Sequence, residues 1–166
     1  NFTYKTVEKL LKEKDFEGAL GMYAQAREQN PNDFELKRNE AAVWVKMAKP
    51  TMDARDWPKA IEIYARAHKA SPDESIFKQN LAYIVQEWSR EIADKDGPTA
   101  GEQLVSKWAE KLPGAYGIKR MKGTIVGAKL RELVKAEKFE TAVTLLEDNR
   151  SAFSGPFDLD KWATHL

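Results

Sequence analysis

The sequence contains no cysteine and only two histidines among its 166 residues. The absence of cysteine excludes disulfides, thiolate metal sites and a cysteine nucleophile within this chain. The two histidines, His68 and His165, lie far apart in the sequence. Neither has the spacing of a metal-binding pair or of a nucleophile with its base. We therefore predict that the chain is not an enzyme and holds no metal or cofactor.

Long apolar runs and an excess of one charge are missing as well. No stretch approaches the roughly 20 apolar residues that a membrane-spanning helix needs, so no membrane span is predicted. Lysine and arginine number 27 against 26 acidic residues, and this net charge of +1 argues against nucleic-acid binding through the overall charge. Hydrophobic residues make up 42% of the chain and charged residues 32%, a balance typical of a folded protein rather than of a disordered one.

The chain repeats its own pattern at an interval of 41 residues. The segment that begins at Asp15 matches the segment that begins at Asp56, and Pro31 matches Pro72 and then Pro113, each 41 positions further on. One position of the pattern holds a small residue in every copy: Ala19, Ala60, Gly101 and Ala142. The position four residues later holds a larger one: Tyr23, Tyr64, Val105 and Leu146. A period of this length is typical of helical repeat proteins.

Each copy contains two segments whose apolar residues stand three or four positions apart. In one of them, the apolar positions are Phe77, Leu81, Ile84, Val85 and Trp88. This spacing predicts two amphipathic helices per copy, with the small residues where two helices approach closely. A helix pair that buries only one face is unstable alone, whereas stacked pairs share a core. The sequence therefore predicts an all-α fold, an α-α superhelix (solenoid) of about four antiparallel helix pairs.

Prolines and acidic residues mark the expected ends of these helices. Asp56 and Asp96 stand just before prolines that a first helical turn tolerates, so we expect each to cap a helix. The three repeated prolines should each stop the helix that precedes them. Pro50 falls within a predicted helix, which should kink or break there.

The second helix of each copy resembles that of the tetratricopeptide repeat, and the matching residues are Ala19, Tyr23, Ala26 and Pro31, then Ala60, Tyr64, Ala67 and Pro72. Agreement in the first helix is best at Asn80-Leu81-Ala82. It is weaker at Asn39-Glu40-Ala41, where an acid replaces the leucine that the family prefers. The copies are about seven residues longer than the family's. We expect the extra length, close to two helical turns, at the end of each first helix, around Lys46–Arg55 and Glu87–Asp96.

The resemblance covers nearly the whole chain and implies one domain over 1–166 with a right-handed superhelix. The copies would span about 1–33, 34–74, 75–115 and 116–156. Residues 157–166 would begin a fifth copy or form a cap. Because the pattern starts and stops partway through helices, we expect a fragment of a longer protein.

In proteins of this family the first helices line a concave groove, where partners bind as extended or helical peptides. The resemblance therefore implies a peptide-binding stripe that comprises Arg38, Asn39, Ala42, Gln79, Asn80, Tyr83, Gln86, Arg120 and Thr124. The same stripe also includes Glu35, Val45, Ile76, Gly117 and Gly127. Polar groups with one aromatic ring suit a peptide backbone and one of its side chains. A merely solvated face is the alternative for each residue.

The two asparagines of the stripe hold equivalent positions, and they fit either a contact between helices or a hydrogen bond to a peptide backbone or its terminal carboxylate. A carboxylate clamp would also need converging basic groups, for which Arg38 and Arg120 are the obvious candidates.

Residues 117–138 carry seven basic and two acidic residues. This segment could bind nucleic acid or another acidic partner, although it lacks the aromatic residues that stack on bases, and it could equally be a solvated face.

We expect a protein-protein interaction scaffold that binds a peptide or protein segment in its concave groove, as a monomer or as part of a larger assembly. Binding of nucleic acid or an acidic partner through 117–138 is one alternative. A structural module that stiffens or dimerises a larger enzyme is another.

Overall fold

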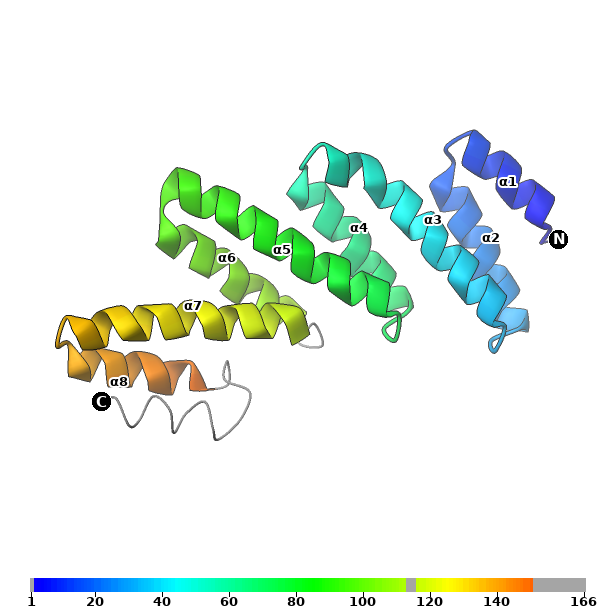
Figure 1. Cartoon of the computed structure of the whole chain (residues 1–166). Coiled ribbons are helices and arrows are strands. Elements are labelled where there is room, and N and C mark those ends of the chain that lie inside the picture. Colours follow the sequence, from blue (N-terminus) through cyan, green and yellow to red (C-terminus); the bar gives the residue numbers. More distant parts are fainter. Residues whose placement is uncertain (1, 113–115, 151–166) are drawn as a thin grey trace. The chain divides into compact units, whose positions relative to one another are not determined.

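The computed structural model describes residues 2–112 and 116–150, with the side chains of Pro98, Tyr116 and Lys119 left out. The described residues form eight α-helices and no β-strand, so the all-α prediction is confirmed (Figure 1). The helices are α1 (Tyr4–Lys12), α2 (Phe16–Gln29), α3 (Phe34–Asp53), α4 (Trp57–Ala70), α5 (Ser75–Asp96), α6 (Pro98–Lys111), α7 (Tyr116–Lys135) and α8 (Phe139–Asp148). The predicted helix stop at Pro113 and the predicted fifth copy at 157–166 lie outside the described residues.

The backbone follows the period of 41 residues that the sequence predicts. Helices α2, α4, α6 and α8 begin at residues 16, 57, 98 and 139, and helices α3, α5 and α7 begin at residues 34, 75 and 116. Every interval within these two series is 41 residues. The copies thus recur in the backbone as well as in the side chains.

The contacts divide the chain into two compact units, Asn1–Phe77 and Lys78–Leu166. In the first unit α1 packs against α2, α2 against α3, and α3 against α4 (Figure 1). In the second unit α6 packs against α7, and α7 against α8. Short loops join these helices, so neighbours in each unit run antiparallel. The single domain and the superhelix that would join all four pairs stay predictions.

Three of the four helix pairs share one kind of turn. Lys14, Arg55 and Glu137 each follow the first helix of a pair and have positive φ angles of 59°, 54° and 58°. In each turn the amide of the next residue donates to the carbonyl five residues back, at 2.8 to 2.9 Å. This is the Schellman pattern at a helix end. A left-handed conformation costs a non-glycine residue about 1–2 kcal/mol. Because three different residues adopt it at the same place, the turn between the two helices requires this conformation, whichever residue occupies it.

The pair of α5 and α6 turns differently. Helix α5 continues to Asp96, and Gly97, with a φ of 97°, is the N-cap residue of α6. The prediction that Asp96 caps this helix is therefore wrong, because the glycine takes the left-handed conformation and leaves α6 without a side-chain cap. The equivalent prediction for Asp56 is confirmed, since its carboxylate accepts from the amide of Lys59.

The first helices carry the extra length that the sequence predicts. Helices α3, α5 and α7 have 20, 22 and 20 residues, whereas α2, α4 and α6 have 14 each. The predicted break at Pro50 is wrong, because α3 continues through it to Asp53, and the alternative of a kink stays a prediction. A proline removes only its own amide donor, and the helix bonds that follow still form: the Pro50 carbonyl accepts from the Ala54 amide at 3.1 Å, and the Thr51 hydroxyl donates to the Ala48 carbonyl at 2.6 Å.

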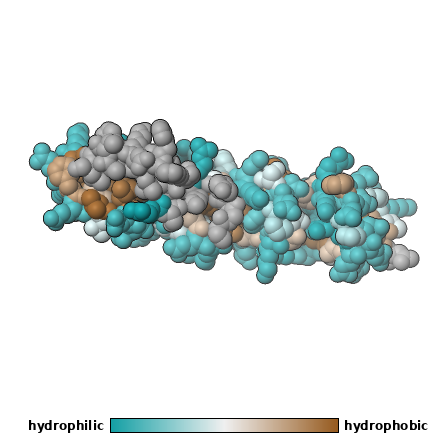
Figure 2. Space-filling model, turned by 90° about the horizontal axis from the view of Figure 1, so that it is seen from below, coloured by the Kyte–Doolittle hydropathy of each residue, from teal (hydrophilic) through white to brown (hydrophobic). Residues whose placement is uncertain are grey.

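Small side chains lie at the centre of each helix pair, as predicted. Ala19, Ala60 and Ala142 are 0% exposed, and the equivalent Gly101 is buried. Around them are larger buried residues such as Tyr23 and Tyr64, and burial raises the pKa of both phenols. In contrast, the described surface seen in Figure 2 is mostly hydrophilic, with hydrophobic residues in small separate areas. The core is thus built on the repeated small positions.

Glu40, the acid that stands where the resembled repeat prefers leucine, is buried at 5% exposure on α3. Its carboxylate accepts from the guanidinium of Arg27 on α2 at 2.6 Å. The same nitrogen of Arg27 donates to the Ser71 hydroxyl at 3.2 Å. Because a buried carboxylate is tolerated only when it is paired, Arg27 explains why an acid can replace leucine at this position.

A second ion pair links α2 to α4 near the surface of the first unit. Arg66 donates to both carboxylate oxygens of Glu17 at 2.9 Å, and its guanidinium lies 5.2 Å from the ring centre of Trp44. Hydrogen bonding to Arg66 lowers the pKa of the Glu17 carboxyl below its usual value. Glu17, Trp44 and Arg66 thus connect three helices of this unit.

Replacing Ala60 with leucine tests the small-residue position. We expect Ala60→Leu to lower the free energy of unfolding by about 1–3 kcal/mol, because the added carbons have no room between the packed helices. Urea denaturation followed by circular dichroism measures the effect. Ala24→Leu, at an exposed position of α2, is the matched control and should change stability by less than about 0.5 kcal/mol. Equal effects of the two substitutions would contradict the packing described here.

Candidate functional site

A pocket of about 730 Å³ lies in the second unit, between α5, α6 and α7. Its walls come from the C-terminal half of α5, the beginning of α6 and the stretch of α7 from Met121 to Glu132. The wall from α5 lies largely within the extra length of the first helices. The longer copies of this chain therefore build a cavity that a shorter first helix would not enclose.

Two glycines set how closely the helices around this pocket approach. A Cβ atom added to Gly117 of α7 would lie 2.6 Å from the Cβ atom of Ala82 on α5. A Cβ atom added to Gly101 of α6 would lie 2.7 Å from the carbonyl oxygen of Ser89 on α5. Both distances are too short for real carbon atoms, so glycine at these positions lets α6 and α7 lie close against α5.

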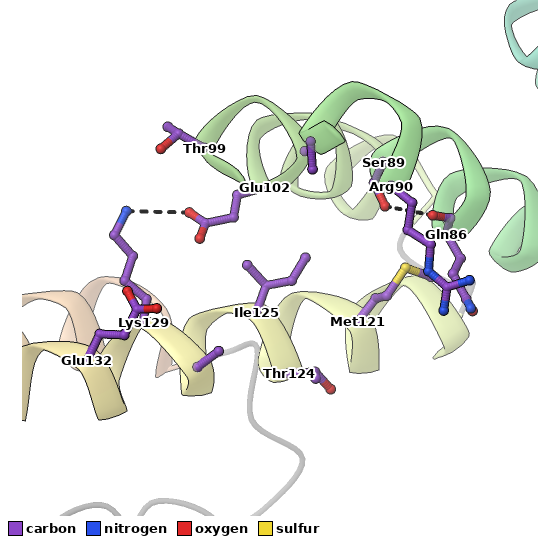
Figure 3. Close-up of a pocket in the computed structure, with 13 residues that line it drawn as sticks. Gln86, Ser89, Arg90, Thr99, Glu102, Met121, Thr124, Ile125, Lys129 and Glu132 are labelled. Carbon is purple, nitrogen blue, oxygen red and sulfur yellow. Dashed lines mark hydrogen bonds and ion pairs between the residues drawn. The ribbon is translucent and has the colours of Figure 1, made fainter. Parts of the chain in front are cut away.

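The lining of the pocket combines apolar and polar side chains. Its apolar part consists of Ala93 from α5 with Met121, Ile125 and Ala128 from α7. The stick view in Figure 3 shows Met121 and Ile125 on the same stretch of α7. Such a mixture of apolar surface with a few polar groups is typical of ligand sites, as is a volume between about 300 and 1,000 Å³.

The polar part contains an ion pair between two helices. Glu102 of α6 and Lys129 of α7 point toward each other, with 3.5 Å between Oε2 and Nζ (Figure 3). Their side chains are 28% and 42% exposed, so the pair is reached by solvent and contributes little to stability. Ser89 is buried and its hydroxyl donates to the Gln86 carbonyl at 2.9 Å. The pair of Glu102 and Lys129 is therefore available to a ligand.

These polar residues stand where most other copies of the repeat are apolar. The position of Glu102 holds Leu20 and Ile61 in the first two copies, and both are buried. The position of Lys129 holds Trp88 in the third copy, Met47 in the second and Thr6 in the first.

Ser89 shows the same departure, because its position holds Ala48 and Leu130, both 0% exposed. The scaffold thus accepts apolar residues at all three positions, and the polar ones gather at this pocket. Comparing the copies position by position would have revealed them, whereas searching for an exposed stripe did not.

Two residues of the predicted stripe, Gln86 and Thr124, line this pocket. Gln79, Tyr83 and Arg120 are exposed on the same two helices, α5 and α7, and Tyr83 is 50% exposed.

The other members of the stripe are placed differently. Asn80 is half-buried on α5. Arg38 and Ala42 are exposed and Asn39 is half-buried on α3, in the first unit. Gly127, which the sequence pattern placed in the stripe, is buried. That expectation is wrong, because this residue belongs to the packed side of α7.

The basic segment 117–138 largely coincides with α7. Part of its charge is already balanced, since Lys129 is paired with Glu102. Among the described residues, no three histidine or acidic side chains gather in a way that could hold a metal ion. None of the described helices is both long and apolar enough to cross a membrane.

Comparisons of the sequence with protein-family models, with curated proteins and with solved structures find no match.

Gly117 offers a test of the close approach between α5 and α7. Alanine in a helix is ordinarily favoured over glycine by about 1 kcal/mol. We expect this gain for Gly21→Ala on α2, where an added Cβ meets no atom within 4 Å. We expect Gly117→Ala to lose stability instead, by about 1–3 kcal/mol, because α7 must move away from α5. Urea denaturation of both variants measures the difference, and equal stabilisation would contradict the close approach.

Proposed function

We propose that this protein is a helical repeat scaffold of the tetratricopeptide type, which binds a peptide or protein segment along its first helices. In this proposal the helix pairs stack as a superhelix, and the stripe on α5 and α7 belongs to the binding surface. The recurrence of helix starts every 41 residues and the buried small residues support a repeat architecture. Such stacks present extended surfaces that suit chain-like partners.

The observation that carries the proposal is the pocket between α5, α6 and α7. Its polar residues replace apolar ones that other copies tolerate, which is unexpected for a purely structural module. Gln86 and Thr124 offer hydrogen-bonding groups, and Met121 and Ile125 offer apolar surface for a side chain. A peptide needs both, because its backbone must keep its hydrogen bonds when it leaves water.

The charge of the lining favours a peptide over nucleic acid. Two basic side chains, Arg90 and Lys129, are matched by two acidic ones, Glu102 and Glu132. A nucleic-acid backbone requires a clear excess of positive charge, and this lining has none. The pocket itself therefore supports the peptide-binding proposal more than the alternative of an acidic partner.

Filling the pocket tests the proposal. A library of random seven-residue peptides displayed on phage is selected on the immobilised chain, and the selected peptides are synthesised and titrated by fluorescence anisotropy. Ala128 lines the pocket with an exposed side chain, so Ala128→Trp should fill the space without disturbing the core. We expect this variant to weaken binding at least tenfold.

Ala24→Trp, at an exposed position on α2 outside the pocket, is the matched control and should bind the peptides unchanged. Circular dichroism verifies that both variants keep their helices. The proposal fails if no peptide is selected, or if the selected peptides bind the two variants equally well.

A further inference from the structure

One charged side chain of the pocket lining forms no ion pair with any described residue. Of the four charged residues of the lining, Arg90 donates to Glu87 at 3.0 Å and Lys129 lies 3.5 Å from Glu102. Glu132 forms no ion pair with any residue in the part of the chain that the structure describes. Its side chain is exposed and lines the pocket near Lys129 (Figure 3). The carboxylate of Glu132 is thus the one charge of the lining that no ion pair among the described residues engages.

Glu132 and the apolar part of the pocket lie on the same face of α7. Ile125 and Glu132 are seven positions apart, which is close to two full helical turns, and both line the pocket. Seven residues of helix span about 10 Å. An extended peptide covers that length with about three residues. A single short peptide segment can therefore reach Ile125 and Glu132 together.

We propose that this pocket selects a peptide in which an apolar side chain is followed or preceded, about three residues away, by a lysine or arginine. The inference rests on the proposed function and names the chemistry of its partner. The apolar side chain packs against Met121 and Ile125, and the basic group pairs with the carboxylate of Glu132. Arg90 and Lys129 each have an acidic partner within the protein, so an acidic peptide would have to compete with Glu87 or Glu102 for them.

Reversing the charge of Glu132 tests this specificity. The same peptide library is selected on the unmodified chain and on Glu132→Lys, and only peptides whose binding Ala128→Trp abolishes are counted. On the unmodified chain we expect lysine and arginine to outnumber acidic residues in these peptides. On Glu132→Lys we expect the opposite preference. Glu110→Lys, an exposed acid of α6 outside the pocket, is the matched control and should keep the original preference.

A synthetic peptide measures the size of the effect. Replacing the basic residue of the tightest-binding peptide by norleucine, which keeps the length of a lysine but removes its charge, should weaken binding to the unmodified chain about fivefold. The same replacement should not weaken binding to Glu132→Lys.

The two proposals fail in different ways. If pocket-dependent peptides appear but show no excess of basic residues, or keep that excess on Glu132→Lys, the inference about Glu132 is overturned and peptide binding stands. If no pocket-dependent peptide appears at all, both proposals are overturned.

Discussion

The close approach of two helices at one small residue is the constraint on which the rest of this protein depends. Ala19, Ala60 and Ala142 have no exposed surface, and Gly101 takes the same position in the remaining pair. Interaxial distances of about 8–10 Å leave no room for larger side chains at such a point. The tyrosines and aliphatic residues around these positions can pack only because the helix axes are held this close. The period of 41 residues repeats this contact and so repeats the helix pair.

The third pair shows how a repeated contact can be altered to make a site. Gly101 lets α6 lie closer to α5 than alanine would, and Gly97 shortens the turn between them to a single residue. Glu102, the next residue after Gly101, then lies at the pocket instead of in the core. A leucine or isoleucine at that position, as in the first two copies, would extend the apolar lining. The same departures from the repeat, Gly97, Gly101 and Glu102, therefore shape the third helix pair and the pocket proposed to bind a peptide.

Much of the fold could be predicted from the sequence, because helix pairing and period depend on local spacing of apolar residues. The extra length of α3, α5 and α7 followed from comparing the period with that of the resembled family. The turn at Asp96 could not be predicted, since either Asp96 or Gly97 could end the helix and only the packing of α6 decides between them. Pro50 was misleading because a proline removes only its own amide donor, and the helix bonds on its C-terminal side form normally.

The candidate site was predicted only in part. Gln86 and Thr124 were found because exposed positions on a helix face can be counted along the sequence. Glu102 and Lys129 were missed because they are 27 positions apart in the sequence and belong to different helices. The spacing of residues within one helix gives no sign of such a pair. Gly127 was placed on the wrong side of α7, since a glycine has no side chain whose polarity could indicate burial.

The most direct measurement restores the repeat at the pocket and records stability and peptide binding together. Glu102→Leu combined with Lys129→Met introduces residues that earlier copies hold at these positions, Leu20 of the first copy and Met47 of the second. If the polar pair is a departure made for binding, the double variant should gain about 1–2 kcal/mol of unfolding free energy, and selected peptides should bind it at least tenfold more weakly. Undiminished peptide binding by a variant that is equally or more stable would contradict the account.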